Sequence, residues 1–175
     1  SQPVFENGRD YGYVETSWAT PASGTRIDGK VYADYVRSKS PGGTNDKPTL
    51  YFGANDGMLH AINGDTGARR WSYLRSALMG KIHKRAAPDY AHDYYVDGPI
   101  TLHDVHDGTN WRTVLVATFG AGAKGLLAMD VTNPDSPSLL WEVVESDAGA
   151  GHIFGEPVIA RANGGVFPFQ RVYEA

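Results

Sequence analysis

The segment from Tyr51 to Trp71 constrains the fold of this chain more than any other. Residues 50–52 and 58–62 are two apolar, β-prone runs. The Asn-Asp-Gly between them is a tight-turn signal, because Asp and Gly tolerate the positive φ of hairpin turns. A Gly-Asp-Thr-Gly turn and a tryptophan follow, and this order is typical of one β-propeller blade. The residues that we expect to set the turns and lock the blade are Asn55, Asp56, Gly57, Gly64, Gly67 and Trp71.

A looser copy of the same pattern follows. Residues 113–119 and 126–130 are its two strands, a glycine-rich bend joins them, and Trp141 takes the place of Trp71. The two tryptophans are further apart than the roughly 40–50 residues of a typical blade, and the surplus is an insertion at residues 74–97. Asp-Gly hairpins arise in many all-β proteins, but the recurrence of turn, strand and tryptophan in the same order favours a shared blade origin. The candidate structural residues of this second half are Asp97, Gly98, Gly125 and Trp141.

We therefore expect an all-β fold, part of a β-propeller of antiparallel four-stranded blades with one short helical insertion. Leu74, Leu78 and Ile82 recur at four-residue steps, which predicts the helix, whereas residues 31–36 are β-prone. Two or three blades cannot close a ring that usually needs four or more, so we expect either partner segments or a longer protein to complete it. The expected organisation is a single domain over residues 1–175, with blade-like units at about 31–73 and 94–143, the helical insertion at about 74–93 and an incomplete further blade at 153–175.

Bulk composition agrees with short strands and many turns, because the chain has 21 glycines and 10 prolines in 175 residues. Its formal net charge of −4 argues against a general binder of nucleic acid or anionic membranes, which needs a basic field. No run approaches the roughly 20 apolar residues of a membrane span. There is no leader pattern, so we expect any signal peptide to be removed or to lie outside this chain. The absence of cysteine excludes disulfides and thiolate metal sites and leaves the compartment open.

With these residues in place, the chain resembles the β-propeller domain of the PilC/PilY family, the large tip-associated proteins of type IV pili. The resemblance covers roughly residues 30–163 in order, and the insertion between the blades is its distinctive part, since generic propeller repeats lack it. The matching segments are residues 51–60, 76–78, 87–98, 115–116, 120–125, 127–134 and 154–161.

The resemblance implies a non-enzymatic, extracellular protein at the cell surface or pilus tip, reached through the periplasm, that supports pilus assembly and adhesion. The implied partners are pilus components, the minor pilins, and host or abiotic surfaces. Family members pair this propeller with a variable adhesive region, which is missing here, so no adhesive target is carried over.

Family members also hold calcium in an Asp-x-Asp-x-Asp loop of the propeller, and this chain has no such loop. Its nearest acidic pairs are Asp104 with Asp107 and Asp130 with Asp135, and neither offers the dense oxygen cage that calcium needs. We therefore expect no cofactor and no metal.

Two other functions share parts of this sequence pattern. Pyrroloquinoline-quinone dehydrogenases have the same blade signature. Those enzymes place the quinone and a calcium ion over the mouth of an eight-bladed ring, with a carboxylate base nearby, and no residue here identifies such a base. A generic propeller module that binds glycans or proteins is the other alternative, for which Tyr11, Tyr13 and Trp18 could supply an aromatic surface or could equally be core.

Two constellations suggest chemistry and have simpler interpretations. His103 and His106 are three residues apart and face opposite sides of a strand, which favours a solvated hairpin tip over a metal site. Residues 120–125 (Gly-Ala-Gly-Ala-Lys-Gly) superficially suggest a phosphate loop. The spacing before the lysine differs from that of a phosphate-binding loop, and a strand rather than a helix follows. We therefore expect a bend between strands.

Overall fold

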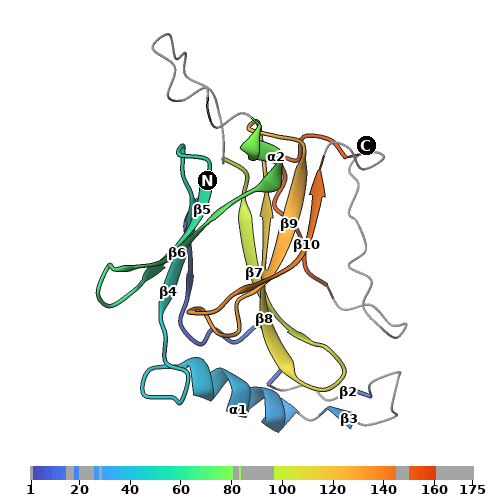
Figure 1. Ribbon diagram of the computed structural model, residues 1–175. Coiled ribbons are helices and arrows are strands. Elements are labelled where there is room, and N and C mark those ends of the chain that lie inside the picture. The colour runs from blue at the N-terminus through green and yellow to red at the C-terminus, as the bar shows by residue number, and fades with distance from the viewer. Residues whose placement is uncertain are drawn as a thin grey trace.

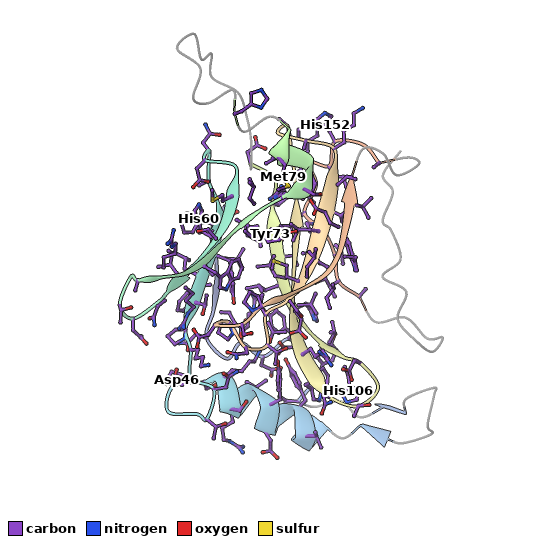
Figure 2. The ribbon with its side chains drawn as sticks, in the orientation of Figure 1. Asp46, His60, Tyr73, Met79, His106 and His152 are labelled. Carbon is purple, nitrogen blue, oxygen red and sulfur yellow. The ribbon has the colours of Figure 1, made fainter. Side chains whose placement is uncertain are left out.

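The computed structural model describes residues 2–14, 18–19, 26–27, 29–80, 83, 97–144 and 150–160. Two four-stranded antiparallel sheets lie side by side, with a helix across one end and a short helix near the other (Figure 1). Asp46 and His106 lie at the first of these ends, and Met79 and His152 lie at the second (Figure 2). The expectation of an all-β fold with four-stranded antiparallel sheets is confirmed.

The first sheet has the strand order β1-β4-β5-β6 and the second the order β10-β9-β8-β7. Strand β1 lies against β7, so one edge strand of each sheet meets the other. A separate two-stranded ribbon joins β2 and β3. The strands are β1 (Val4–Glu6), β2 (Trp18–Ala19), β3 (Arg26–Ile27), β4 (Thr49–Gly53), β5 (Met58–Asn63), β6 (Arg69–Leu74), β7 (Ile100–His106), β8 (Trp111–Thr118), β9 (Gly125–Asp130) and β10 (Ser138–Val144).

The two sheets share one register around their tryptophans. Ala61 of β5 pairs with Trp71 of β6, and Ala128 of β9 pairs with Trp141 of β10. In each sheet the residue before the tryptophan is the extra residue of a β-bulge. A one-residue slip would exchange the two faces of a strand, so the matching register shows that the sheets repeat one structural unit.

Residues 31–36, which the sequence predicts to be β-prone, belong instead to helix α1 (Gly29–Lys39). That prediction was wrong because valine and tyrosine favour strands only when a sheet partner is available, and packing overrides the weak propensity. Tyr32 and Val36, four residues apart, lie on the face of α1 that packs against Trp111 of the second sheet. The first strand of the first sheet is therefore β1, well before residue 31.

Helix α2 (Ser76–Met79) is the described part of the insertion that the sequence predicts to be helical at about 74–93. Ile82 and most of the rest of that insertion lie outside the described residues, as does the chain beyond residue 160. Residues 150–160, where a further blade is expected to begin, contain no strand.

The main core lies between the two sheets. Tyr51, Leu59 and Ala61 project from the first sheet and are at most 1% exposed. A large apolar side chain such as that of Leu59 contributes roughly 1.5–3 kcal/mol when it is fully buried. They meet a larger set from α2 and the second sheet, namely Leu78, Ile100, Leu102, Leu115, Ala117, Phe119, Ala123, Leu127, Met129 and Val131.

A valine at Gly57 should destabilise the protein by about 1–3 kcal/mol, because Gly57 has a φ of 87°, which a β-branched residue rarely adopts. Its amide donates to the oxygen of Ala54 at 3.1 Å and so closes the turn between β4 and β5. A thermal melt would measure the effect, with Gly80→Val as the control, since Gly80 is exposed at a φ of −72°. Equal melting temperatures for the two variants would contradict this role of Gly57.

Candidate functional site

Trp71 joins the two sheets. Its indole N–H donates to the oxygen of Pro134, in the turn between β9 and β10, at 2.8 Å. On its other side the ring lies 5.9 Å from that of Tyr51. The side chain therefore anchors the outer strand of the first sheet to a turn of the second.

Charged side chains hold the same turn from outside. Lys47 lies 2.8 Å from the carboxylate of Asp135 and 2.9 Å from Asn133 Oδ1, and Arg70 also pairs with Asp135. The hydrogen bond from Lys47 is the main reason that the pKa of Asp135 lies below its usual value. Because Asp135 is half exposed, these pairs contribute little energy each and mainly fix the position of the turn.

Replacing Trp71 by phenylalanine should lower the free energy of unfolding by about 1–3 kcal/mol, because the buried oxygen of Pro134 loses its donor and a small gap opens. Urea unfolding followed by circular dichroism would measure the loss. Arg70→Lys keeps a cation beside Asp135 and serves as the control. A Trp71→Phe loss no larger than the control's would contradict a joining role for the indole N–H.

Trp141 occupies the equivalent place in the second sheet and points away from the first. It packs against Val114, Val116 and Ala128, which are at most 4% exposed on the far face of that sheet. Ile159 of the last described segment packs against the same cluster.

The predicted turn residues of the first sheet lie at its two ends. Asp56 Oδ1 accepts from the amide of Met58 at 2.9 Å, and Asn55 is exposed beside it. At the opposite end Gly67 has a φ of 71° and donates to the oxygen of Asn63. Gly64 donates to the oxygen of Pro48 at 2.8 Å, and a Cβ there would lie 2.8 Å from the ring of Phe5.

Asp56 also takes part in a chain of polar side chains. The two nitrogens of the His60 ring lie 2.7 Å from Asp56 Oδ2 and 2.8 Å from Ser72 Oγ. Phe52 stacks on the ring at 5.2 Å between centroids. An acid, an imidazole and a hydroxyl are the components of a hydrolase triad, but here His60 links the turn before β5 to strand β6 beneath an aromatic ring. We interpret these three hydrogen-bonded side chains as a structural link.

Asp97 and Gly98 lie just before strand β7 and pack on the glycine-rich bend at residues 120–125. Asp97 Oδ1 accepts from the amide of Ala121 at 3.1 Å, and a Cβ on Gly98 would lie 2.3 Å from Thr118 Oγ1. A Cβ on Gly120 would lie 2.1 Å from Asp97 Oδ1 and 2.7 Å from the amide nitrogen of Gly98, and Gly125 ends the bend with a φ of 117°. The bend joins strands, as the sequence predicts.

Arg75, fully buried, connects the end of β6 to this region. Its guanidinium lies 4.2 Å above the ring of Phe119 and donates to the oxygen of Thr118 at 3.2 Å. Burial lowers the pKa of Arg75 to about 10. A cation over an aromatic face in a dry site is worth about 2 kcal/mol or more, which partly offsets its desolvation.

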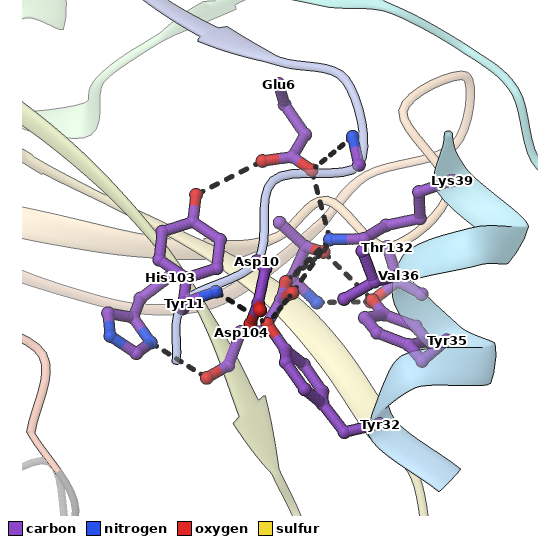
Figure 3. Close-up of polar contacts among 12 residues, drawn as sticks. Glu6, Asp10, Tyr11, Tyr32, Tyr35, Val36, Lys39, His103, Asp104 and Thr132 are labelled. Atoms are coloured by element: carbon purple, nitrogen blue, oxygen red, sulfur yellow. Dashed lines mark hydrogen bonds and ion pairs between the residues drawn. The ribbon is translucent and has the colours of Figure 1, made fainter. Parts of the chain in front are cut away.

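The most unusual site is a buried charge cluster, which we define as Glu6, Lys39, Asp104 and Thr113 (Figure 3). The Nζ atom of Lys39 lies 2.8 and 2.9 Å from the two carboxylate oxygens of Asp104. It lies 3.0 Å from Glu6 Oε1 and 3.0 Å from Thr113 Oγ1. The cluster therefore ties helix α1 to β1 of the first sheet and to β7 and β8 of the second.

Tyrosines enclose the charge cluster. The hydroxyl of Tyr32 donates to Asp104 Oδ2 at 2.9 Å, that of Tyr11 donates to Glu6 Oε2 at 3.2 Å, and Tyr35 shares a hydrogen bond with Thr113. Burial raises the pKa of Asp104, an effect that Lys39 opposes, and burial likewise raises the pKa of each tyrosine hydroxyl. Burial thus favours the neutral form of Asp104 and of these three tyrosines.

The charge cluster was not predicted from the sequence. Its members are far apart in the chain, no element was expected around Glu6, and Lys39 ends helix α1, which takes the place of the β-prone segment at residues 31–36. One signal was available, since the alternation along residues 100–105 places Asp104 on the same face as Ile100 and Leu102. An acid buried within a strand calls for a partner.

The structure does not bring His103 and His106 together, so the two histidines do not form a metal site. His103 lies against Tyr11, 4.6 Å between ring centroids, whereas His106 meets Trp111 edge-on. Tyr13 packs against Trp111 and Tyr32, so Tyr11 and Tyr13 belong to the packing beneath α1. The side chain of Trp18 lies outside the described residues.

The acidic pairs do not fit calcium. Asp104 is bound to Lys39, Asp107 and Asp130 both pair with Arg112, and Asp135 pairs with Lys47 and Arg70. Within the described ranges no group of three or more His, Asp or Glu side chains could hold a metal ion. Neither α1 nor α2, the helices in the part of the chain that the structure describes, has the length and apolarity of a membrane span.

Known proteins are similar to this chain in sequence and in architecture. Residues 29–170 match the family described as the PilY1 beta-propeller domain. A protein of Xylella fastidiosa named Type IV pilus biogenesis factor PilY1 homolog is 38% identical over 172 residues, which are 95% of this chain and 13% of that protein. Type IV pilus biogenesis factor PilY1 of Pseudomonas aeruginosa is 43% identical over 122 residues, 67% of this chain and 10% of that protein.

The crystal structure of the Pseudomonas aeruginosa PilY1 C-terminal domain is similar with a TM-score of 0.60 and 34% identity, and it covers 77% of this chain and 25% of that one. The two sheets of equal register are thus part of a β-propeller, as the sequence predicts. The chain belongs to the PilY1 β-propeller family, which confirms the resemblance to PilC/PilY proteins. It spans about an eighth or less of the curated relatives described above, 13% and 10% of their lengths.

Proposed function

We propose that this chain is part of the propeller of a non-enzymatic, pilus-associated protein that supports type IV pilus assembly and adhesion. The observation that carries the proposal is the 38% and 43% identity to proteins named type IV pilus biogenesis factors. The contacts of Trp71, Arg75 and the charge cluster, which join one sheet to the other, support a platform role. The dehydrogenase alternative has no comparable support.

The protein works outside the cell, at the cell surface or pilus tip, and reaches that place through the periplasm. Its partners are pilus components, with the minor pilins first, and host or abiotic surfaces. The net charge of −4 supports protein partners over nucleic acid. The role needs no cofactor bound by this chain, because the acidic pairs that calcium would use are engaged with cations.

Deletion of the encoding gene tests the assembly role. We expect fewer surface pili, with reduced twitching motility and adherence, and recovery when the full-length gene is restored. Unchanged pili and adherence in the deletion strain would overturn the proposal.

Two full-length variants connect this outcome to the propeller. Lys39→Met disrupts the charge cluster, whereas Lys47→Met removes a half-exposed cation of the same kind. We expect only the first variant to fail in restoring pili. A thermal melt with added calcium and quinone, on the purified chain, tests the cofactor proposal and should show no shift.

A further inference from the structure

The charge cluster places an amine against a carboxyl group in a dry site. Lys39 and Asp104 have side chains that are 5% and 0% exposed, and Nζ lies within 2.9 Å of both Asp104 oxygens. A second carboxylate, Glu6, lies 3.0 Å from the same nitrogen. Two carboxyl groups thus share one cation, an arrangement whose desolvation is poorly compensated while all three groups stay charged.

We propose that Lys39 and Asp104 condense within the folded protein to form an isopeptide bond between Nζ and Cγ, with Glu6 as the proton carrier. The product is an intramolecular amide that covalently joins helix α1 to strand β7; Figure 3 shows the two side chains without this bond.

The reaction balances with the groups present. A proton passes from the Lys39 ammonium to the Asp104 carboxylate and leaves a neutral amine beside a neutral acid. Nζ attacks Cγ, and Glu6 takes one proton from the nitrogen. Glu6 then returns that proton to the departing hydroxyl of Asp104, the C–O bond breaks, and one water molecule leaves. Glu6 ends as it began, a carboxylate, and no oxidant or other reactant is required.

The surroundings favour each stage. The hydroxyls of Tyr32 and Thr113 donate to Asp104 Oδ2 and Oδ1 at 2.9 and 2.8 Å, so each oxygen that carries charge during attack has a donor. Burial raises the pKa of Asp104 and so favours the neutral acid, which is the form that an amine attacks. The fold holds nitrogen and carbon together, which removes the entropic cost of their encounter.

Glu6 and the new amide carbonyl keep hydrogen-bond donors in the product. Glu6 keeps the hydroxyl of Tyr11 at 3.2 Å and the amide of Gly8 at 3.1 Å, and the new carbonyl oxygen keeps a hydroxyl donor. The opposite charges of Lys39 and Asp104 disappear together from a buried place, so the net charge of the cluster is unchanged and rests on Glu6, which keeps these two donors.

A second pair in the same chain provides a natural control. Lys47 and Asp135 are also 2.8 Å apart, but their side chains are 33% and 47% exposed. Water solvates both charges there, and the other neighbour of Asp135 is the cation of Arg70 rather than a proton-accepting carboxylate. We expect no bond at this pair.

Intact mass spectrometry of the denatured, purified chain tests the proposal. The bond removes one water, so the mass should fall about 18 Da below that of the sequence. Trypsin should then release a branched peptide joining residues 38–69 to residues 86–112, uncut after Lys39. The variants Lys39→Arg and Glu6→Gln should show the full mass, and Lys47→Arg should keep the deficit. Circular dichroism checks that each variant folds.

Three outcomes would overturn the inference. The full sequence mass in the folded, unsubstituted chain would show that no bond forms. A deficit that persists in Lys39→Arg would locate the water loss elsewhere, as in an Asp-Gly succinimide. A deficit that persists in a folded Glu6→Gln variant would show that Glu6 does not carry the proton.

Discussion

Replacing Lys39 by methionine is expected to lower the free energy of unfolding by about 3–5 kcal/mol. Methionine has a similar length and fills much of the same space, so the loss comes from the missing ammonium or, where Lys39 is joined to Asp104, from the missing cross-link. Asp104 and Glu6 remain buried, with side chains 0% and 10% exposed, and no longer have a cation between them. Both acids must then either stay charged without compensation or take up protons. Urea unfolding at neutral pH would measure the effect.

Lys47→Met is the matched control for this prediction. Lys47 makes an ion pair at 2.8 Å with Asp135, as Lys39 does with Asp104, but in a half-exposed position. Surface ion pairs contribute about 0–1 kcal/mol, so the control should lose little. A Lys39→Met protein as stable as Lys47→Met would mean that the charge cluster does not hold α1 on the sheets.

An alanine at Gly125 should cost about 3–5 kcal/mol, for two reasons that act together. Gly125 has a φ of 117°, outside the range that an L side chain adopts readily. A Cβ there would also lie only 1.9 Å from the oxygen of Val143 in the neighbouring strand. Strands β9 and β10 would have to separate at their first pair, beside the ring of Phe119.

Gly151→Ala separates these effects from a general cost of adding a methyl group. A Cβ at Gly151 meets nothing within 4 Å, and its φ lies outside the positive range. We expect the control to melt within a degree or two of the unsubstituted protein, as surface substitutions usually do. If Gly125→Ala melts at that same temperature, the close approach of β9 and β10 does not constrain this position.

The sequence predicts the paired strands well because their signals are local. The turn at Asn55–Gly57, the alternation in β5 and the tryptophans all lie within one hairpin, where neighbouring residues decide the conformation. The alignment of Trp71 with Trp141 in sequence is also their alignment in register.

What the sequence could not predict depends on contacts between distant segments. Helix α1 is short and rich in valine and tyrosine, so its conformation depends on Trp111, which lies far along the chain. Glu6, Lys39 and Asp104 likewise have no pattern in common, because three separate elements bring them together. The charge cluster could be recognised only once those elements were placed.

The shared register of the two sheets also bears on how such a molecule could arise. Each sheet carries its own tryptophan and bulge at matching positions, and the turn after β9 receives the indole N–H of Trp71. A structural unit that carries both a hydrogen-bond donor and a hydrogen-bond acceptor for neighbouring units can be repeated in tandem without further sequence changes. Duplication of a gene segment would thus add a blade together with the means of attaching it, and the two copies could then diverge, one of them acquiring a helix in place of a short loop.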